Sequence, residues 1–298
     1  LAYQRELQNL EYEEKQEVIR ILKTLSYQIR PYTPLLESYL VYLAHLDVIG
    51  SKAKYAYSIN GLLPKIGKTK RIFFKNAYHP ILLVKNKEAN LEVIPQSIEL
   101  NEQQQIIVIS GPNAGGKSIT LKTIGLLQVM LQSGILIPVD ERSETTVFDT
   151  VLTDIGDNQS IENQLSTYSY RLKNMRYFLR KCNERTLFLI DEFGTGSDPE
   201  LGGALAEIFL EELYHKKAFG IITTHYSNLK VLANELDNVT NANMQFNEQT
   251  LEPLYKLYVG QAGSSFTFEV AQKNGIPFSL INKAKKRVET EKIRLDKT

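Results

Sequence analysis

Apolar residues recur at helical spacing through the first sixty residues of the chain, with glutamate and lysine residues between them. Spacings of three, four and seven place these residues on one face, which predicts a helix. Pro31 and Pro34 interrupt the pattern, because proline lacks an amide hydrogen and its ring clashes with the preceding turn. A second helical pattern continues from Leu36 toward Tyr57. The first stripe fits either a coiled-coil arm or a plain surface helix, and it consists of Leu7, Leu10, Val18, Ile21, Leu22, Leu25 and Ile29.

From Arg71 onward, short apolar runs alternate with helical patterns, after a boundary marked by Gly61, Pro64 and Gly67. Strands that alternate with helices indicate an α/β fold with a largely parallel sheet and a ligand at the carboxyl ends of the strands. The expected strands are Arg71–Phe74, Ile81–Val84, Ile106–Ile109, Thr146–Leu152, Thr186–Ile190, Phe219–Thr224, Asn241–Asn247 and Leu254–Val259. The expected helices are Ser118–Gln132, Ser160–Cys182, Glu200–Lys216, Phe266–Lys273 and Pro277 to about Glu291.

The segment Gly111–Ser118 lies between the expected strand Ile106–Ile109 and a helical stretch that starts at Ile119. It fits the phosphate-binding pattern G-x-x-x-x-G-K-[ST]. Glycines let the backbone amides turn inward around phosphates, and the following helix N-terminus adds a positive dipole. Lys117 can reach the β- and γ-phosphates, and the Ser118 hydroxyl can ligate Mg²⁺. The alternative is an ordinary glycine turn, but the spaced pattern favours a site for a nucleoside triphosphate.

The apolar strand Leu187–Ile190 ends in two acids, Asp191 and Glu192, which is the Walker B pattern. Asp191 can hold Mg²⁺ beside Ser118, directly or through water. Glu192 can polarise a water molecule in line with the γ-phosphate. Acidic residues often begin loops, so this pattern alone does not indicate a catalytic site. It does so here because a P-loop precedes it in the sequence. Together the two motifs predict hydrolysis of the nucleotide.

Three further motifs carry less information when each is taken alone. The apolar run Ile221–Thr224 ends at His225, which can donate a hydrogen bond to the γ-phosphate or the attacking water. The alternative is a surface histidine at a strand end whose hydrogen bonds are satisfied locally. The glycine loop Gly194–Pro199 fits both a helix start and a contact with a second subunit. The segment Gln164–Ser169 indicates, on chemistry alone, only a helix start.

The amino-acid composition limits the kinds of partner and the cellular compartment that fit these motifs. The chain carries 35 lysines and arginines against 34 acids, a formal net charge of +1, which gives no support for a nucleic-acid footprint over the whole surface. The single cysteine, Cys182, excludes an internal disulfide and suits a reducing cytosol. We find no signal peptide and no apolar run long enough to cross a bilayer, so we expect a cytoplasmic protein without membrane contact. Because Leu1 already lies in a helical pattern, we expect the chain to be a piece of a longer protein.

The combined motifs resemble the MutS family of DNA repair ATPases, which belong to the ABC ATPase superfamily. The resemblance rests on Gly111–Thr123, Leu165–Tyr168, the pair Asp191–Glu192 with its glycine loop, and Thr223–Tyr226. It covers nearly the whole chain, since the early helices resemble the family's lever and core segment. It implies an ABC-type P-loop ATPase with a mixed, mainly parallel sheet, preceded by an all-helical lever and core segment. The implied division is 1–70 for the lever and core segment, 71–262 for the ATPase domain and 263–298 for a helical dimerisation element.

The resemblance also implies a site shared by two copies of the chain. One copy supplies the P-loop and Walker B residues, and the other supplies Ser166 from its Ser-Thr-aromatic motif. Asn113 resembles the P-loop asparagine that helps to set the nucleotide and this contact in trans. The implied catalytic residues are Glu192, His225, Lys117 and, in trans, Ser166, and the implied cofactors are ATP and Mg²⁺, with Ser118 and Asp191 as metal ligands. Val93 and Ile94 stand where the family places an apolar residue against adenine, so ATP is expected to contact Val93, Ile94, Gly111, Pro112, Asn113, Ala114, Gly115, Gly116, Lys117, Ser118 and Ile119.

The expected function is that of an ATP-hydrolysing dimerisation module of a MutS-type DNA-binding protein. Such a homodimer would couple ATP binding and hydrolysis to the clamping of mismatched or branched DNA in mismatch repair or recombination control, mostly through regions outside this chain. The segments Leu131–Gly134, Ile155–Glu162 and Leu165–Ser169 look more like the branch that suppresses recombination, rescues collided ribosomes and often carries a C-terminal Smr nuclease.

Other functions stay open at this point. One alternative is an ATP-gated binding module that acts on stalled ribosomes or nucleic acid without mismatch recognition. Another is a protein that holds ATP only as a static clamp, against which the intact Glu192 and His225 argue. A third is a small-molecule kinase, which would need a substrate pocket and a lid, and the combination of Asp191, Glu192 and Ser166 gives no reason to expect them.

Overall fold

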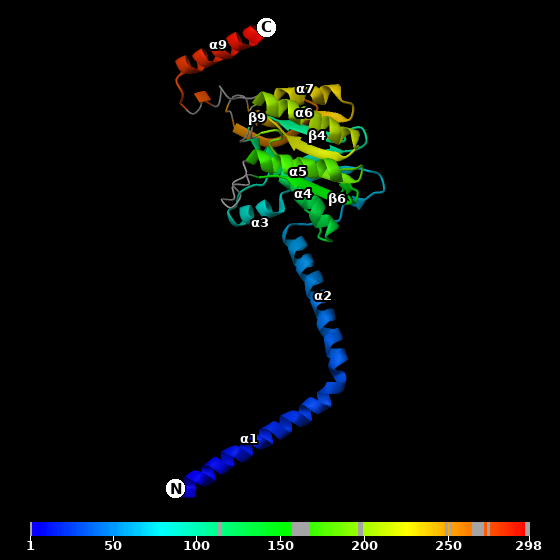
Figure 1. The fold of residues 1–298 in the computed structure, drawn as a ribbon, viewed down its shortest axis with the longest axis vertical. Coiled ribbons are helices and arrows are strands. Elements are labelled where there is room, and N and C mark those ends of the chain that lie inside the picture. Colours follow the sequence, from blue (N-terminus) through cyan, green and yellow to red (C-terminus); the bar gives the residue numbers. More distant parts are fainter. Residues whose placement is uncertain are drawn as a thin grey trace. The chain divides into compact units, whose positions relative to one another are not determined.

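A computed structural model describes residues 2–112, 115–156, 167–195, 199–247, 250, 252–263, 271–272 and 275–295 (Figure 1). Contacts within the chain divide it into two compact units, Leu1–Tyr55 and Ala56–Thr298. The sequence-based divisions at residues 70 and 262 stay predictions about the domains.

Two long helices make up the first unit. Helix α1 covers Ala2–Ile29 and helix α2 covers Thr33–Ser58, with one turn of 3-10 helix, η1, at Arg30–Tyr32 between them. Pro31 lies in that turn, where its missing amide hydrogen interrupts the α-helical hydrogen bonds. Side chains 3–49 are all exposed, including the apolar stripe of α1. The predicted pair of helices with a break at the prolines is confirmed.

The second unit is built on a six-stranded sheet in the order β10-β9-β4-β8-β7-β6. The five strands from β9 to β6 run parallel, and β10 is antiparallel to β9. The central strands β4, β8 and β7 are buried along their whole length, as expected of parallel strands covered on both faces. The bounds are Ile106–Ser110 for β4, Thr150–Asp154 for β6, Thr186–Ile190 for β7, Phe219–Thr223 for β8, Val239–Asn247 for β9 and Glu252–Val259 for β10.

Helices cover both faces of this sheet. Helix α4 (Lys117–Gln132) packs on strands β6, β7 and β8. Helices α5 (Thr167–Lys181), α6 (Pro199–His215) and α7 (Ser227–Glu235) lie side by side on the opposite face (Figure 1). Alternate strand residues point to opposite faces, so Ile106, Val108, Phe188 and Ile222 share one core cluster with these three helices.

A smaller sheet, in the order β1-β5-β2-β3, completes the second unit. Strand β3 also contacts β10 of the large sheet. The bounds are Lys65–Ile66 for β1, Ile72–Ala77 for β2, Gln96–Leu100 for β3 and Glu144–Thr145 for β5, with helix α3 at Pro80–Glu88 and helix α9 at Phe278–Leu295. The predicted α/β fold with a mixed, mainly parallel sheet is confirmed.

One predicted strand is wrong. The run Ile81–Val84 lies in helix α3. Pro80 is the first residue of that helix, where proline fits well, and the Nδ1 atom of His79 accepts a hydrogen bond from the Leu82 amide at 3.5 Å. A short apolar run does not by itself distinguish a buried strand from a helix, and here the cap residues decide.

Other boundaries differ in detail. Strands β1, β3 and β5 and helix α7 were not expected, and the expected strand Thr146–Leu152 is found as β6, which begins later, at Thr150. The remaining strands and helices are found with ends shifted by a few residues. Residues 160–166 of one expected helix, and most of Phe266–Lys273, lie outside the described residues.

Candidate nucleotide-binding site

Three motifs meet at one edge of the large sheet, because they follow three adjacent parallel strands. The P-loop starts at Gly111 after β4, Asp191 follows β7, and His225 comes two residues after β8. Strand β8 lies between the other two, with Ile109 paired to Thr223 and Ile190 paired to Ile222. The carboxyl ends of these strands therefore place the phosphate-binding loop, the two acids and the histidine together.

The described part of the P-loop has the backbone that its glycines permit. Gly111 has φ +121° and Gly116 has φ +93°, values that side chains with a Cβ rarely adopt. Gly116 caps α4, which begins at Lys117, so the helix N-terminus points its amides at the loop. A Cβ on Gly116 would also lie 3.1 Å from Cδ1 of Tyr255. Asn113 and Ala114 lie outside the described residues.

Lys117 is nearly enclosed, with 2% of its surface exposed. Its Nζ atom donates a hydrogen bond to the Gly111 carbonyl at 2.5 Å. Burial lowers the pKa of Lys117 to about 8, while the negative charges of Asp191 and Glu192 act in the opposite direction. The site therefore contains a desolvated lysine whose protonated form would be stabilised by a bound anion.

Asp191 is held by a strand-end threonine. The Thr223 hydroxyl donates to Oδ1 of Asp191 at 2.6 Å and accepts from the amide of Glu192 at 2.8 Å. Both Asp191 and Thr223 are buried. Thr223 belongs to the sequence motif around His225, but its residue type alone predicted no role for it.

Glu192 and His225 are brought close together but not into direct contact. Their nearest polar atoms, Oε1 and Nε2, are 3.9 Å apart, and each side chain is about one-third exposed. Burial lowers the pKa of His225, the charge of Lys117 lowers it further, and Glu192 opposes the shift. A neutral imidazole with one N–H donor is therefore favoured near pH 7.

Arg171 of α5 reaches the same loop from the side. Its Nη1 atom donates to the Glu192 carbonyl at 2.5 Å and to the Thr195 hydroxyl at 2.7 Å. Arg171 was not predicted from the sequence, because one arginine in a helix that also contains Lys173, Arg176 and Arg180 carries no distinctive signal.

A cavity of about 280 Å³ lies next to the P-loop. Val93, Ile94 and Ile119 line it, as does Tyr255, an aromatic residue that sequence analysis missed. Tyr255 has φ +53° at an irregularity of β10, and its carbonyl accepts a hydrogen bond from the Gln96 amide. The cavity thus offers apolar side chains and one aromatic ring beside the phosphate-binding loop.

The predicted metal ligands, Ser118 and Asp191, fit Mg²⁺ by the chemistry of their donors. A hydroxyl and a carboxylate supply the hard oxygens that Mg²⁺ prefers. Within the described residues, no group of three or more histidine, cysteine or acidic side chains could hold a metal ion. An ion here would therefore complete its shell with water and phosphate oxygens, as Mg²⁺ usually does. Ser166, the residue expected to act in trans, lies outside the described residues.

Comparison with known proteins identifies the family behind this arrangement. A family model described as MutS domain V matches residues 107–292, the segment that holds the P-loop, both acids and the histidine. The chain belongs to the MutS family. Its amino-acid sequence is also similar to those of MutS2 proteins. Endonuclease MutS2 of Finegoldia magna is 44% identical over 286 residues, which are 96% of this MutS chain and 36% of that protein.

A second relative gives the same result. Endonuclease MutS2 of Lactiplantibacillus plantarum is 40% identical over 278 residues, which are 93% of this chain and 35% of that protein. The chain thus spans about a third of the length of these MutS relatives. The expected family, its MutS2-like branch and the ABC-type P-loop ATPase fold are confirmed.

The family match supports the coarse assignment of this segment as a nucleotide-binding ATPase module of the MutS type. The role of each individual residue in this chain stays a prediction. No helix in the described ranges combines the length and the apolar composition that crossing a membrane requires.

Proposed function

We propose that this chain is the ATP-hydrolysing dimerisation module of a MutS-type DNA-binding protein. The observation that supports this most directly is the convergence of Lys117, Asp191, Glu192 and His225 at the carboxyl edge of adjacent parallel strands. They supply a cation for the phosphates, a carboxylate for Mg²⁺, a carboxylate for water and a hydrogen-bond donor. P-loop NTPases use groups of these kinds to hydrolyse a phosphoanhydride.

Nucleotide binding in this proposal starts from Lys117. Its ammonium, which donates to the Gly111 carbonyl in this structure, would donate to oxygens of the β- and γ-phosphates when ATP binds. The negative triphosphate raises the lysine pKa that burial has lowered. Adenine enters the neighbouring cavity, where Val93 and Ile94 provide apolar contact and the Tyr255 ring provides a surface for stacking.

Magnesium would be held by Ser118 and Asp191, with the Asp191 carboxylate oriented by Thr223. When bound, the ion neutralises charge on the β- and γ-phosphates. Burial of Asp191 keeps bulk water away from this carboxylate, which strengthens its attraction for a cation.

The hydrolytic step uses Glu192 and His225. Glu192 accepts a proton from a water molecule as its oxygen attacks the γ-phosphorus, and the bond between that phosphorus and the bridging oxygen breaks. The neutral His225 donates its N–H to an oxygen of the transferring phosphoryl group, where charge accumulates. The products are ADP and phosphate, and Glu192 returns its proton to solvent.

Completion of the site by a second copy of the chain is the part of the proposal that rests on family resemblance. Asn113 and Ser166 are the residues proposed to join the two copies. ATP that binds the closed dimer more tightly than the open one drives closure, and hydrolysis reverses it. By reciprocity, DNA held by the closed form strengthens ATP binding. The proposed substrates are mismatched or branched DNA, contacted mostly by regions outside this chain.

The relatives favour one branch within this proposal. The two proteins compared above are named endonuclease MutS2, and we place the chain with them, in a role in recombination control. The second candidate function is an ATP-gated module that acts on stalled ribosomes, which the same branch supports. Nuclease activity is a property named for the relatives, and the proposal for this chain covers the ATPase portion alone.

The experiment that tests hydrolysis compares the wild type with Glu192→Gln. We expect Glu192→Gln to lower kcat by roughly 10²- to 10⁴-fold, the usual contribution of a general base, with ATP binding retained. Phosphate release and the binding of a fluorescent ATP analogue provide the two readouts. Arg176→Gln, at an exposed position of α5, serves as the control. A wild type that binds ATP without measurable turnover would instead support a static clamp.

A further inference from the structure

Glu192 has a backbone conformation that needs external support. Its φ of +50° lies in the left-handed region, which is unfavourable for any residue with a Cβ. Such a residue persists where surrounding contacts hold it. The neighbours on both sides are anchored, since Asp191 and Phe193 are buried. Glu192 itself is about one-third exposed, so the direction of its carboxylate depends on how its own backbone is held.

Side chains and the loop itself, rather than strand partners, hold the two polar backbone groups of Glu192. Its amide donates to the Thr223 hydroxyl at 2.8 Å. Its carbonyl accepts from Nη1 of Arg171 at 2.5 Å, a shorter contact than those from the Thr195 hydroxyl at 2.9 Å and the Thr195 amide at 3.2 Å. The same Nη1 atom donates to the Thr195 hydroxyl at 2.7 Å and lies 3.3 Å from the Asp191 carbonyl. One nitrogen atom thus gathers three oxygens of the loop that carries Glu192.

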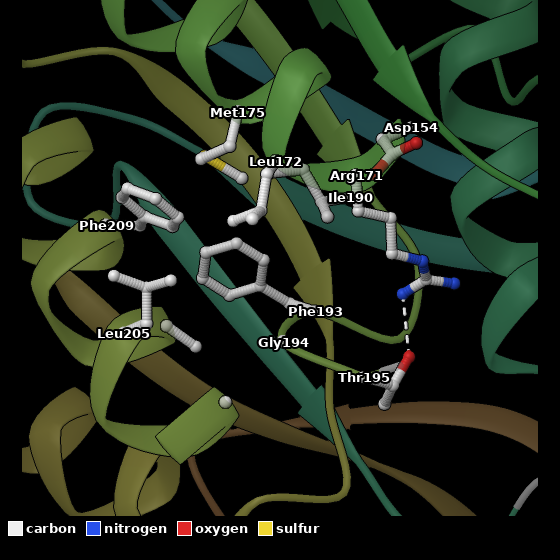
Figure 2. A pocket seen from close by; sticks show the side chains of 12 residues that line it. Asp154, Arg171, Leu172, Met175, Ile190, Phe193, Gly194, Thr195, Leu205 and Phe209 are labelled. Atoms are coloured by element: carbon white, nitrogen blue, oxygen red, sulfur yellow. Dashed lines mark hydrogen bonds between the residues drawn. The ribbon is translucent and has the colours of Figure 1, made fainter. Parts of the chain in front are cut away.

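The surroundings of Arg171 keep this nitrogen in place. Its side chain lines a largely apolar pocket with Leu172, Met175 and Phe193 (Figure 2). Figure 2 shows the Arg171 side chain to one side of these residues, with its guanidinium directed toward Thr195, to which a dashed line joins it. Hydrogen bonds from a charged donor at a partly buried site are stronger than those at an exposed one.

We infer that Arg171 is a positioning residue for ATP hydrolysis, because it fixes the backbone of Glu192 and so the distance from the Glu192 carboxylate to His225. This inference rests on the proposed function, since it assigns Glu192 the role of base. Arg171 comes from α5, whereas Glu192 follows β7. Hydrolysis therefore depends on the position of α5. A displacement of that helix changes the direction of the Glu192 carboxylate and leaves the conformation of the P-loop unchanged.

The experiment compares Arg171→Met and Arg171→Lys with the wild type in the full chain. Methionine keeps an apolar stem in the pocket but donates no hydrogen bond. Lysine keeps the charge, but its Nζ atom is one bond closer to the backbone than Nη1. Arg176→Met, at an exposed position of the same helix, is the matched control. For each variant we measure kcat, KM, the affinity for a non-hydrolysable ATP analogue and Tm.

We expect Arg171→Met to lower kcat roughly 10- to 100-fold, the usual effect of misplacing a catalytic group by about 1 Å. KM and analogue affinity should stay within about threefold, because Lys117 and the P-loop are untouched. Arg171→Lys should recover part of kcat, and Arg176→Met should match the wild type.

Two results would overturn the inference. One is a wild-type kcat in folded Arg171→Met. The other is a parallel loss of kcat, analogue affinity and Tm, which indicates a structural role only. If Arg171→Met does not fold, folded Arg171→Lys decides: a lowered kcat with unchanged KM supports the inference, and a wild-type kcat contradicts it. A wild-type chain without ATP turnover would refute the proposed function itself. Failure of the proposed function is thus distinguished from failure of the inference about Arg171.

Discussion

The imidazole of His225 and the carboxylate of Glu192 lie 3.9 Å apart, measured between Nε2 and Oε1, beyond the ends of the adjacent parallel strands β8 and β7. That separation is too long for a direct hydrogen bond. It leaves both groups able to turn toward a third partner, such as water or a phosphate oxygen. The pair is therefore arranged to act on a ligand rather than on each other.

The first prediction concerns the donor in this pair. His225→Ala should lower kcat roughly 10²-fold, the effect of removing one donor to developing charge, with little change in KM. His225→Gln keeps an N–H group and should retain more activity than His225→Ala. Steady-state phosphate release at saturating ATP is the measurement. Equal kcat values for wild type and His225→Ala would exclude histidine from the hydrolytic step.

The second prediction concerns the proton on Lys117. Because the pKa of Lys117 is lowered to about 8, about half of the lysines are neutral at pH 8. Bound triphosphate raises that pKa, so ATP binding at pH 8 should take up as much as about half a proton per site. Isothermal titration calorimetry in buffers of different ionisation enthalpy measures this uptake. Lys117→Arg should abolish it, since arginine stays charged, and an absence of uptake in the wild type would contradict the account.

The third prediction also follows from the lowered pKa of Lys117, and it concerns how the free energy of unfolding, measured without nucleotide, depends on pH. A lysine whose folded pKa lies below its unfolded value of 10.5 binds fewer protons in the folded state between about pH 8 and 10.5. The contribution of Lys117 to the free energy of unfolding therefore rises with pH across that window. Lys117→Met should flatten the rise in urea titrations from pH 8 to 10, whereas an unchanged slope would argue against a desolvated lysine.

The fourth prediction tests the packing between strands β7 and β8, which carry site residues at their ends. A Cβ on Gly220 of β8 would lie 2.1 Å from the Phe188 ring of β7. Both strands are fully buried, so Gly220→Ala should lower the free energy of unfolding by about 1–3 kcal/mol through overpacking. Gly50→Ala is the control, since no atom lies within 4 Å of its added Cβ and alanine favours helix. Thermal unfolding measures both, and an unchanged Tm for Gly220→Ala would mean that Phe188 moves aside freely.

The strand-end motifs could be predicted because each one is local in the sequence. Gly111–Ser118 and Asp191–Glu192 directly follow apolar strands, and parallel strands end at one edge. The error at Ile81–Val84 has the opposite cause. Four apolar residues fit a strand or a helix equally well, and the cap by His79 and Pro80 is the feature that decides between them.

Residues that reach the site from distant elements could not be predicted in this way. Arg171 lies 21 positions before Glu192, and Gln96, which holds the Tyr255 carbonyl, lies 159 positions before it. Their contacts depend on how α5 packs beside the sheet and on an irregularity in β10. Neither feature leaves a periodic or compositional signal, because each involves a single side chain or a single distorted residue.

The central claim is that the catalytic site is completed by a second copy of the chain. The most direct test measures ATP turnover per chain against protein concentration, with the fraction of dimer followed in parallel by light scattering. We predict that turnover rises with the dimer fraction and reaches a plateau when dimerisation is complete, whereas Glu192→Gln stays low throughout. Equal turnover per chain in a dilute, fully monomeric sample would contradict the shared site.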